Sequence, residues 1–303
     1  MSSAVPVAAS SAPSLDLDPS LATWGVLGLL VAGMLAIDLL VFARDHTPRM
    51  REAAAWSVVW LVVAVAFGAA FWAWQGGEAG GQFFAGYLLE RTLSLDNVFV
   101  FAVILAYFAV PAAVQPKVLS WGIALALVLR LALILVGAAL LDTFHATFYV
   151  FGAVLLVSAW KLVRREGHEV APERNRALRL LPKQLRAKPL VVVFVVVATT
   201  DVVFAIDSIP AIFAVTSEPF DVFGANGFAV DGQRALYFLL AGMMDRFVYL
   251  SHGLALILAV IGAKMLLIDV WHPPIWLSLG VIVTVLAATV ALSLRAEPEG
   301  SAV

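Results

Sequence analysis

Long apolar segments constrain this chain more than any other feature of its sequence. Several run for 18 residues or more, and an α-helix rising 1.5 Å per residue needs about 20 residues to cross a hydrocarbon core about 30 Å thick. Of the 303 residues, 62% are hydrophobic and 13% are charged, and that charged fraction is about half the fraction in a soluble domain. The sequence therefore predicts an all-α polytopic membrane protein that is embedded in the lipid bilayer.

Charged residues and Gly/Pro clusters divide the apolar sequence into about nine predicted transmembrane helices. Their approximate bounds are 21–43, 53–75, 83–109, 118–141, 146–163, 189–216, 234–250, 253–271 and 274–294. Residues 1–20 are rich in Ala, Ser and Pro and contain no basic residue. A signal peptide needs a positive segment before its apolar run, so this stretch is interpreted as a disordered N-terminal tail.

The distribution of lysine and arginine predicts how the chain is oriented. Basic residues follow the odd-numbered spans at Arg44, Arg49, Arg51, Lys117, nine positions from Lys161 to Lys188, Arg246 and Arg295. The joints after even-numbered spans contain none, apart from Arg234 at the edge of the seventh span. Basic loops stay in the cytoplasm, so we expect an external N-terminus, a cytoplasmic C-terminus and a basic cytoplasmic loop at 164–188. The acidic loop 217–231 is interpreted as an ordinary external polar loop, with a cation-attracting mouth as the alternative.

Two acidic stretches match each other in two halves of the chain. Glu90 and Asp96 are six residues apart, and so are Asp201 and Asp207. Arg130 and Arg234 precede Asp142 and Asp245 by similar distances. The matches predict two repeats of three spans, and an odd number of spans makes the second copy inverted. The predicted organisation is two N-terminal helices at 21–82, a first repeat at 83–163, a second at 189–271, and a last helix with a C-terminal tail at 272–303.

The repeated acids are candidates for a binding site. A carboxylate in the middle of a membrane helix costs about 2.5–3.5 kcal/mol even on a lenient insertion scale. Oxygen ligands favour a hard cation such as Mg²⁺, Ca²⁺ or Mn²⁺, and the chain has no cysteine that could supply thiolate ligands or a redox switch. The candidate metal ligands are Glu90, Asp96, Asn97, Asp201, Asp207 and Ser208.

Helical geometry leaves the form of this site open. On a straight helix Glu90 and Asn97 share one stripe, whereas Asp96 lies about 100° away. Either the helices unwind near the site, or the acids line two sides of a small cavity. Pro210 offers a kink that frees backbone carbonyls.

Other interpretations of the acids also remain. They could pair structurally with Arg91, Arg130 or Arg234, or they could relay protons. Arg130 is expected to neutralise a repeat carboxylate when the site is empty. Asp38, late in the first span, is interpreted as an interfacial residue, with membership of the site as the alternative.

The same segments resemble the signature motifs of the TerC family of integral membrane proteins. They are Glu-Arg-Thr-Leu-Ser-Leu-Asp-Asn-Val-Phe-Val-Phe at 90–101, Thr-Asp-Val-Val-Phe-Ala-Ile-Asp-Ser-Ile-Pro-Ala-Ile at 200–212, Ala-Ile-Asp-Leu-Leu-Val-Phe at 36–42 and Gly-Ala-Lys-Met-Leu at 262–266. The family is named for tellurite resistance, occurs in bacterial inner membranes and includes manganese exporters. One position departs from the family pattern, because Ala198 stands where a glutamate is frequent.

The resemblance implies Mn²⁺ efflux across the bacterial inner membrane, with Mn²⁺ as transported substrate and no prosthetic group. We expect a transporter and not an enzyme, with protons as a candidate counter-ion and no nucleic-acid partner. The alternative function is a membrane anchor or assembly subunit of a tellurite-stress complex, in which the buried acids are structural. Neither protein partners nor the oligomeric state can be predicted from these residues.

Overall fold

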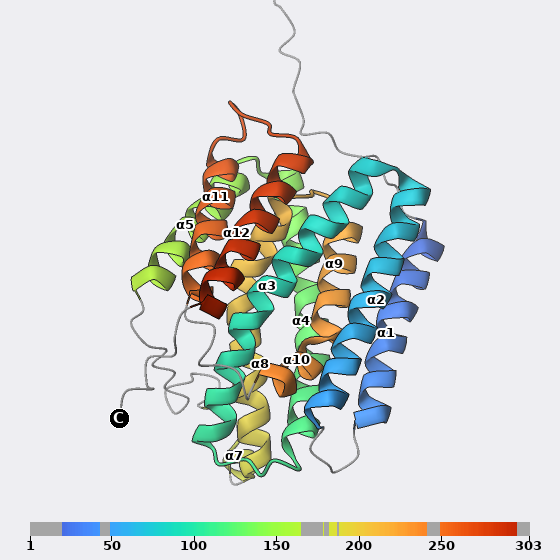
Figure 1. Ribbon diagram of the computed structural model, residues 1–303, viewed down its shortest axis with the longest axis vertical. Coiled ribbons are helices and arrows are strands. Elements are labelled where there is room, and N and C mark those ends of the chain that lie inside the picture. Colours follow the sequence, from blue (N-terminus) through green and yellow to red (C-terminus); the bar gives the residue numbers. More distant parts are fainter. Residues whose placement is uncertain are drawn as a thin grey trace, which may run out of the picture.

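The computed structural model describes residues 20–42, 49–164, 178, 182–186, 188–240 and 249–295, and all its regular elements there are helices (Figure 1). The helices are α1 Leu21–Phe42, α2 Met50–Gln75, α3 Gly77–Tyr107, α4 Gln115–Thr143, α5 Ala146–Arg164, α7 Lys183–Arg186, α8 Pro189–Phe213, α9 Pro219–Asp231, α10 Gln233–Leu240, α11 Leu250–Leu266 and α12 Ile275–Arg295. The predicted N-terminal tail, most of the basic loop 164–188 and the C-terminal tail fall outside the described residues.

Six of the described helices are long and apolar enough to cross a membrane: α1, α2, α4, α5, α8 and α12. Their outward faces carry large apolar side chains, such as Leu29, Val62 and Val128. Only 11% of the apolar window of α12 is buried inside the protein. Exposing so much contiguous apolar surface to water would be unfavourable, which identifies lipid as the surrounding solvent. The prediction of an all-α multi-pass membrane protein is therefore confirmed.

The two helices that carry the repeated acids, α3 and α8, pack against each other inside the bundle. Consecutive long helices run in alternating directions, with α1 and α2 on one flank and α5, α11 and α12 on the other (Figure 1). α4 packs on α8, and α9 packs on α3. α5 and α11 approach most closely where Gly152 faces Gly262, and a methyl group at Gly152 would lie 2.9 Å from the Gly262 carbonyl oxygen. Small residues allow this close packing of membrane helices.

The interpretation of 217–231 as an external polar loop is wrong. Residues Pro219–Asp231 form α9, which is buried along its whole length. Its aromatic side chains pack on neighbouring helices, with Phe220 5.4 Å from Trp24 and Phe228 4.4 Å from Phe67 between ring centroids. These contacts outweigh the acidic residues that suggested a loop, and they carry polar side chains of α9 into the protein interior.

The start of the predicted seventh span, 234–250, agrees with that of α10, but the helix before it was not predicted. α10 starts at Gln233 and continues α9 with only Gly232 between them, so the two helices together cover residues 219–240. At 1.5 Å per residue this length is about 30 Å. Residues 241–248, the second half of the predicted span, are outside the described part of the chain.

Candidate functional site

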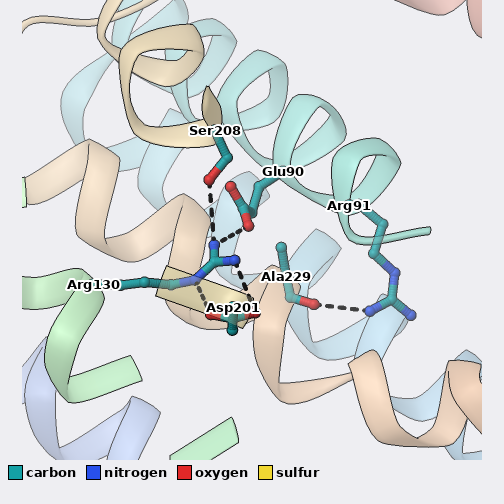
Figure 2. Close-up of polar contacts among 6 residues, drawn as sticks. All are labelled: Glu90, Arg91, Arg130, Asp201, Ser208 and Ala229. Carbon is teal, nitrogen blue, oxygen red and sulfur yellow. Dashed lines mark hydrogen bonds and ion pairs between the residues drawn. The ribbon is translucent and has the colours of Figure 1, made fainter. Parts of the chain in front are cut away.

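Arg130 connects the two repeated acidic segments at the centre of the bundle (Figure 2). Its side chain comes from α4 and is 0% exposed. Nε donates to Asp201 Oδ2 on α8 at 2.8 Å, Nη2 donates to Asp201 Oδ1 at 3.2 Å, and Nη1 donates to Glu90 Oε1 on α3. The planar guanidinium thus binds Asp201 through two parallel hydrogen bonds and reaches the second acid with its remaining edge. The expectation that Arg130 neutralises a repeat carboxylate is confirmed.

The charges of this centre do not balance. Two buried carboxylates face one guanidinium, and Glu90 Oε2 has no hydrogen-bond partner among the described residues. Ser208 Oγ accepts a longer hydrogen bond of 3.4 Å from Arg130 Nη1. Buried charges are tolerated only when they are paired and hydrogen-bonded. The centre therefore has one oxygen, and formally one negative charge, available for a further positive group.

A cavity of about 460 Å³ lies beside the Arg130 centre, between α3, α5, α8 and α11. Its polar lining is formed by Asn97, Ser158, Lys161, Thr200, Asp207 and Ser208. Asp207 is half-buried and accepts a 2.6 Å hydrogen bond from Ser158 Oγ. Ser208 lines the cavity and also accepts a hydrogen bond from Arg130, so the cavity adjoins the centre formed by the buried acids.

Both acid-bearing helices are continuous through the site, since α3 spans Gly77–Tyr107 and α8 spans Pro189–Phe213. The unwinding considered for these helices is therefore not what the structure has. Instead, Asp201 faces Arg130 and Asp207 lines the cavity, so the repeated acids do not line two sides of one cavity among the described residues. Pro210 lies inside α8. It has no N–H to donate to the carbonyl of Ile206, four residues earlier, and Ile206 lines the cavity.

Five of the six predicted ligands fall into two adjoining groups. Glu90, Asp201 and Ser208 meet at Arg130, whereas Asn97, Asp207 and Ser208 line the cavity. The backbone of Asp96 lies in α3, but its side chain is outside the described part of the structure. Among the side chains that are described, no three or more His, Asp or Glu residues form a ready-made metal cluster.

A second buried ion pair lies between α1 and α10, and the sequence interpretation misplaced it. Asp38 is buried and accepts a hydrogen bond from Arg234 Nη2, while Arg234 Nη1 donates to Ser120 Oγ on α4 at 2.6 Å. The interfacial interpretation of Asp38 is therefore wrong. The signal that could have placed it was Arg234, a second arginine at the position that matches Arg130 in the repeat. Arg91, another candidate partner of the acids, instead donates to the Ala229 carbonyl at 2.9 Å.

Lipid-facing apolar helices around a buried, charged centre define an integral, multi-pass membrane protein. The model of the integral membrane protein TerC family matches residues 75–300. The chain is also 43% identical, over 88% of its own length and 92% of the relative's, to Alx of Escherichia coli (strain K12), which carries the provisional name of membrane-bound redox modulator. An uncharacterized membrane protein of Myxococcus xanthus, STKORF319, is 41% identical over 89% of this chain and 91% of its own. This chain belongs to the TerC family. No solved structure matches it.

Proposed function

We propose that this TerC-family protein moves a hard divalent cation, Mn²⁺ in the first place, out of the bacterial cytoplasm across the inner membrane. The observation that carries the proposal is the cavity of about 460 Å³ that adjoins the Glu90–Arg130–Asp201 centre. A hydrated ion needs room, and it needs oxygen ligands that replace its water. The cavity supplies both at the contact of the two acid-bearing helices.

The ligand chemistry favours a hard ion. Asp207 offers carboxylate oxygens, Asn97 an amide oxygen and Ser208 a hydroxyl oxygen at the cavity. Oxygen ligands without sulfur suit Mn²⁺, Mg²⁺ and Ca²⁺, and membership of a family that includes manganese exporters favours Mn²⁺ among them. Asp96, one residue before Asn97, is the additional carboxylate that we assign to the site.

Arg130 is the internal counter-ion of the empty site. It holds Glu90 and Asp201 together, so α3, α4 and α8 stay joined when no metal is present. A divalent ion that reaches these acids competes with the guanidinium for the same oxygens. Release of Arg130 from the acids then frees α4 to move relative to α3 and α8, which couples ion binding to a change in helix packing.

Helix contacts favour an alternating-access mechanism between inverted repeats. If α3, α4 and α5 correspond to α8, α9–α10 and α11, a two-fold relation exchanges the α4–α8 contact with the α9–α3 contact. The α3–α8 and α5–α11 contacts are then each related to themselves. All four contacts occur, as such a relation requires. The proposed ion site lies at the α3–α8 contact, where inverted-repeat transporters bind their substrates.

One wall of the cavity is formed by the part of α5 nearest the side that we assign to the cytoplasm. Ser158 and Lys161 line it from the last two turns of α5. α5 runs toward the end of the bundle at which α4 and α8 begin, near Lys117 and Lys188, and its last residue is Arg164. Basic ends are retained in the cytoplasm. This orientation suits export, because the ion would enter the site from inside the cell.

The anchor or assembly-subunit function remains the second candidate, and one observation favours it. Arg130 already pairs with two of the predicted ligands, as a purely structural role for these acids requires. The redox role in the provisional name of Alx suggests a further alternative. These 303 residues contain no cysteine, so thiol–disulfide exchange by the chain itself is excluded.

The decisive measurement is Mn²⁺ flux into proteoliposomes that contain the purified protein, with and without a pH gradient. Asp207→Asn and Asp96→Asn are expected to reduce the flux to that of empty liposomes. The control is Asp142→Asn, which alters an exposed carboxylate at the end of α4 and is expected to leave flux unchanged. Flux at the wild-type rate in Asp207→Asn would contradict the site.

A neutral substitution at Glu90 separates transport from anchoring. Glu90→Gln removes one acid but leaves both hydrogen bonds between Arg130 and Asp201 in place. A structural centre tolerates this change, whereas an ion site loses flux. If wild type and Asp207→Asn both show no flux under either condition and Glu90→Gln folds normally, the anchor function is the better explanation.

A further inference from the structure

Asp231, at the C-terminal end of α9, is a buried acid that the Mn²⁺ site does not use. It is 1% exposed, and neither carboxylate oxygen has a hydrogen-bond partner among the described residues. Gln233, two residues later, is also 1% exposed, and neither atom of its amide is partnered. A buried carboxylate without a partner is strongly unfavourable when it is charged. Such a group calls for a ligand that removes its charge.

The charged groups around Asp231 increase this need. Asp38 on α1 is close enough for its negative charge to act on the Asp231 carboxyl group. Arg234, three residues from Asp231, donates to Asp38 and to Ser120. The other helices packed against α9 carry further ionisable groups, among them Tyr87, Glu90 and Arg91 on α3, Arg130 on α4, Asp201 on α8, and Glu52 at the start of α2. Of these, Arg130 is bound to Glu90 and Asp201, and Arg91 is bound to a backbone carbonyl.

The ligand that fits this position is a proton. A hard metal ion needs several oxygen ligands, and no group of three or more His, Asp or Glu side chains that could hold one is found among the described residues. A proton neutralises the carboxyl group without needing additional space or several oxygen ligands.

We propose that Asp231 binds the proton that is exchanged for the transported metal ion. This inference rests on the proposed function, and it names the counter-ion and the residue that carries it. The step is Asp231–COOH giving Asp231–COO⁻ and H⁺. The new negative charge repels that of Asp38, the residue that binds Arg234 of α10. Loss of the proton thereby changes how α10 is held against α1.

A hydrogen-bonded pair of polar side chains lies one turn beyond Arg234 on α10, at the start of α4. Tyr237 Oη donates to Gln115 Oε1 at 3.1 Å. Gln115 is half-buried at the first turn of α4, and its Nε2 donates to the Val110 carbonyl at 3.1 Å. Tyr237 and Gln115 thus form a polar contact between α10 and α4 that is distinct from the cavity lining.

The experiment compares two modes of transport in Asp231→Asn, which keeps the size of the side chain but cannot release a proton. Exchange of Mn²⁺ across the vesicle membrane at equal pH tests the metal site alone. Accumulation of Mn²⁺ against its gradient, driven by an opposing proton gradient, tests coupling. Asp231→Asn is expected to retain exchange and to lose driven accumulation, while Asp142→Asn retains both.

Two outcomes would overturn the proposal. One is driven accumulation at the wild-type level in Asp231→Asn. The other is that Asp231→Asn elutes as folded protein but loses both exchange and accumulation, and that Asp231→Glu loses both as well. Asp231 would then have a structural role. Infrared difference spectra of wild type minus Asp231→Asn give a reading that needs no transport. They should contain the carbonyl band of a protonated carboxylic acid at neutral pH, and its absence refutes the proton site.

The same spectra separate failure of this inference from failure of the proposed function. If wild type shows no Mn²⁺ flux under either condition, the metal-transport proposal fails. The proton site then stands on the infrared band alone, or falls with its absence.

Discussion

Replacing Arg130 with methionine tests the electrostatic argument on which the site depends. Methionine keeps an unbranched apolar side chain in α4 but removes the guanidinium. Glu90 and Asp201 would then face each other without a cation, and the hydrogen bonds of 2.8 and 3.2 Å to Asp201 would be lost. Both acids are buried, so water cannot substitute for these bonds.

The expected loss follows from the difference between breaking a buried ion pair and removing it entirely. Taking away one partner of a buried pair destabilises a protein by about 3–5 kcal/mol, because a charge remains buried without compensation. Replacing all the charged members by neutral ones of similar size is often close to neutral. The free energy of unfolding of Arg130→Met should therefore be about 3–5 kcal/mol lower than that of wild type. The triple variant Arg130→Met, Glu90→Gln, Asp201→Asn should come within about 2 kcal/mol of wild type.

The assay is reversible chemical unfolding of the purified protein in detergent micelles, without added metal. Arg164→Met is the matched control, because this arginine is exposed and stacks over Trp160 at 4.3 Å, a contact expected to contribute about 0.5–1 kcal/mol. Equal stability of Arg130→Met and wild type would refute the argument. So would a triple variant as unstable as the single one, since the loss would then come from packing and not from uncompensated charge.

Two further substitutions test packing and the second ion pair. Gly152→Ala should lower the free energy of unfolding by about 1–3 kcal/mol, because its new methyl group would lie 2.9 Å from the Gly262 carbonyl oxygen. The control is Gly280→Ala, whose methyl group meets nothing within 4 Å and which should be neutral or stabilising by about 0.5–1 kcal/mol. Unfolding in detergent compares the two variants. Asp38→Asn should lose about 3 kcal/mol by leaving Arg234 buried without its carboxylate, and adding Arg234→Met should recover most of that loss; no recovery in the double variant would show that the two residues do not act as a pair.

Apolar periodicity and charge spacing were sufficient to predict much of this molecule. The bounds of α1, α2, α5 and α12 follow the predicted spans within a few residues. Glu90, Arg130 and Asp201 were identified from the repeat, and the structure places them in contact. Helices in a membrane must satisfy their own backbone hydrogen bonds, so a long apolar run permits few other structures. The sequence therefore predicted where helices form better than it predicted which helices pack against each other.

Polar residues in short segments were harder to place. The acids of 217–231 suggested an exposed loop, but Phe220, Phe223 and Phe228 bury this segment as α9. Asp38 looked interfacial because Arg44 and Asp45 follow it, yet it is buried against Arg234. Whether a single acid faces lipid headgroups or a buried arginine depends on which helices surround it. That information is tertiary and is absent from local spacing.

The different partners of the two matching arginines explain how the central acids keep their negative charge. Arg130 neutralises one of the two charges on Glu90 and Asp201. If Arg234 occupied the equivalent place in the second unit, two arginines would face two acids, and nothing would remain to attract a cation. Instead Asp38 of α1 binds Arg234 and holds it in a separate pair. α1 lies outside residues 75–300, the part of the chain that the family model matches. We therefore extend the proposed function to α1, which would act on the cation site without contact with the ion by withholding the second arginine from the central acids.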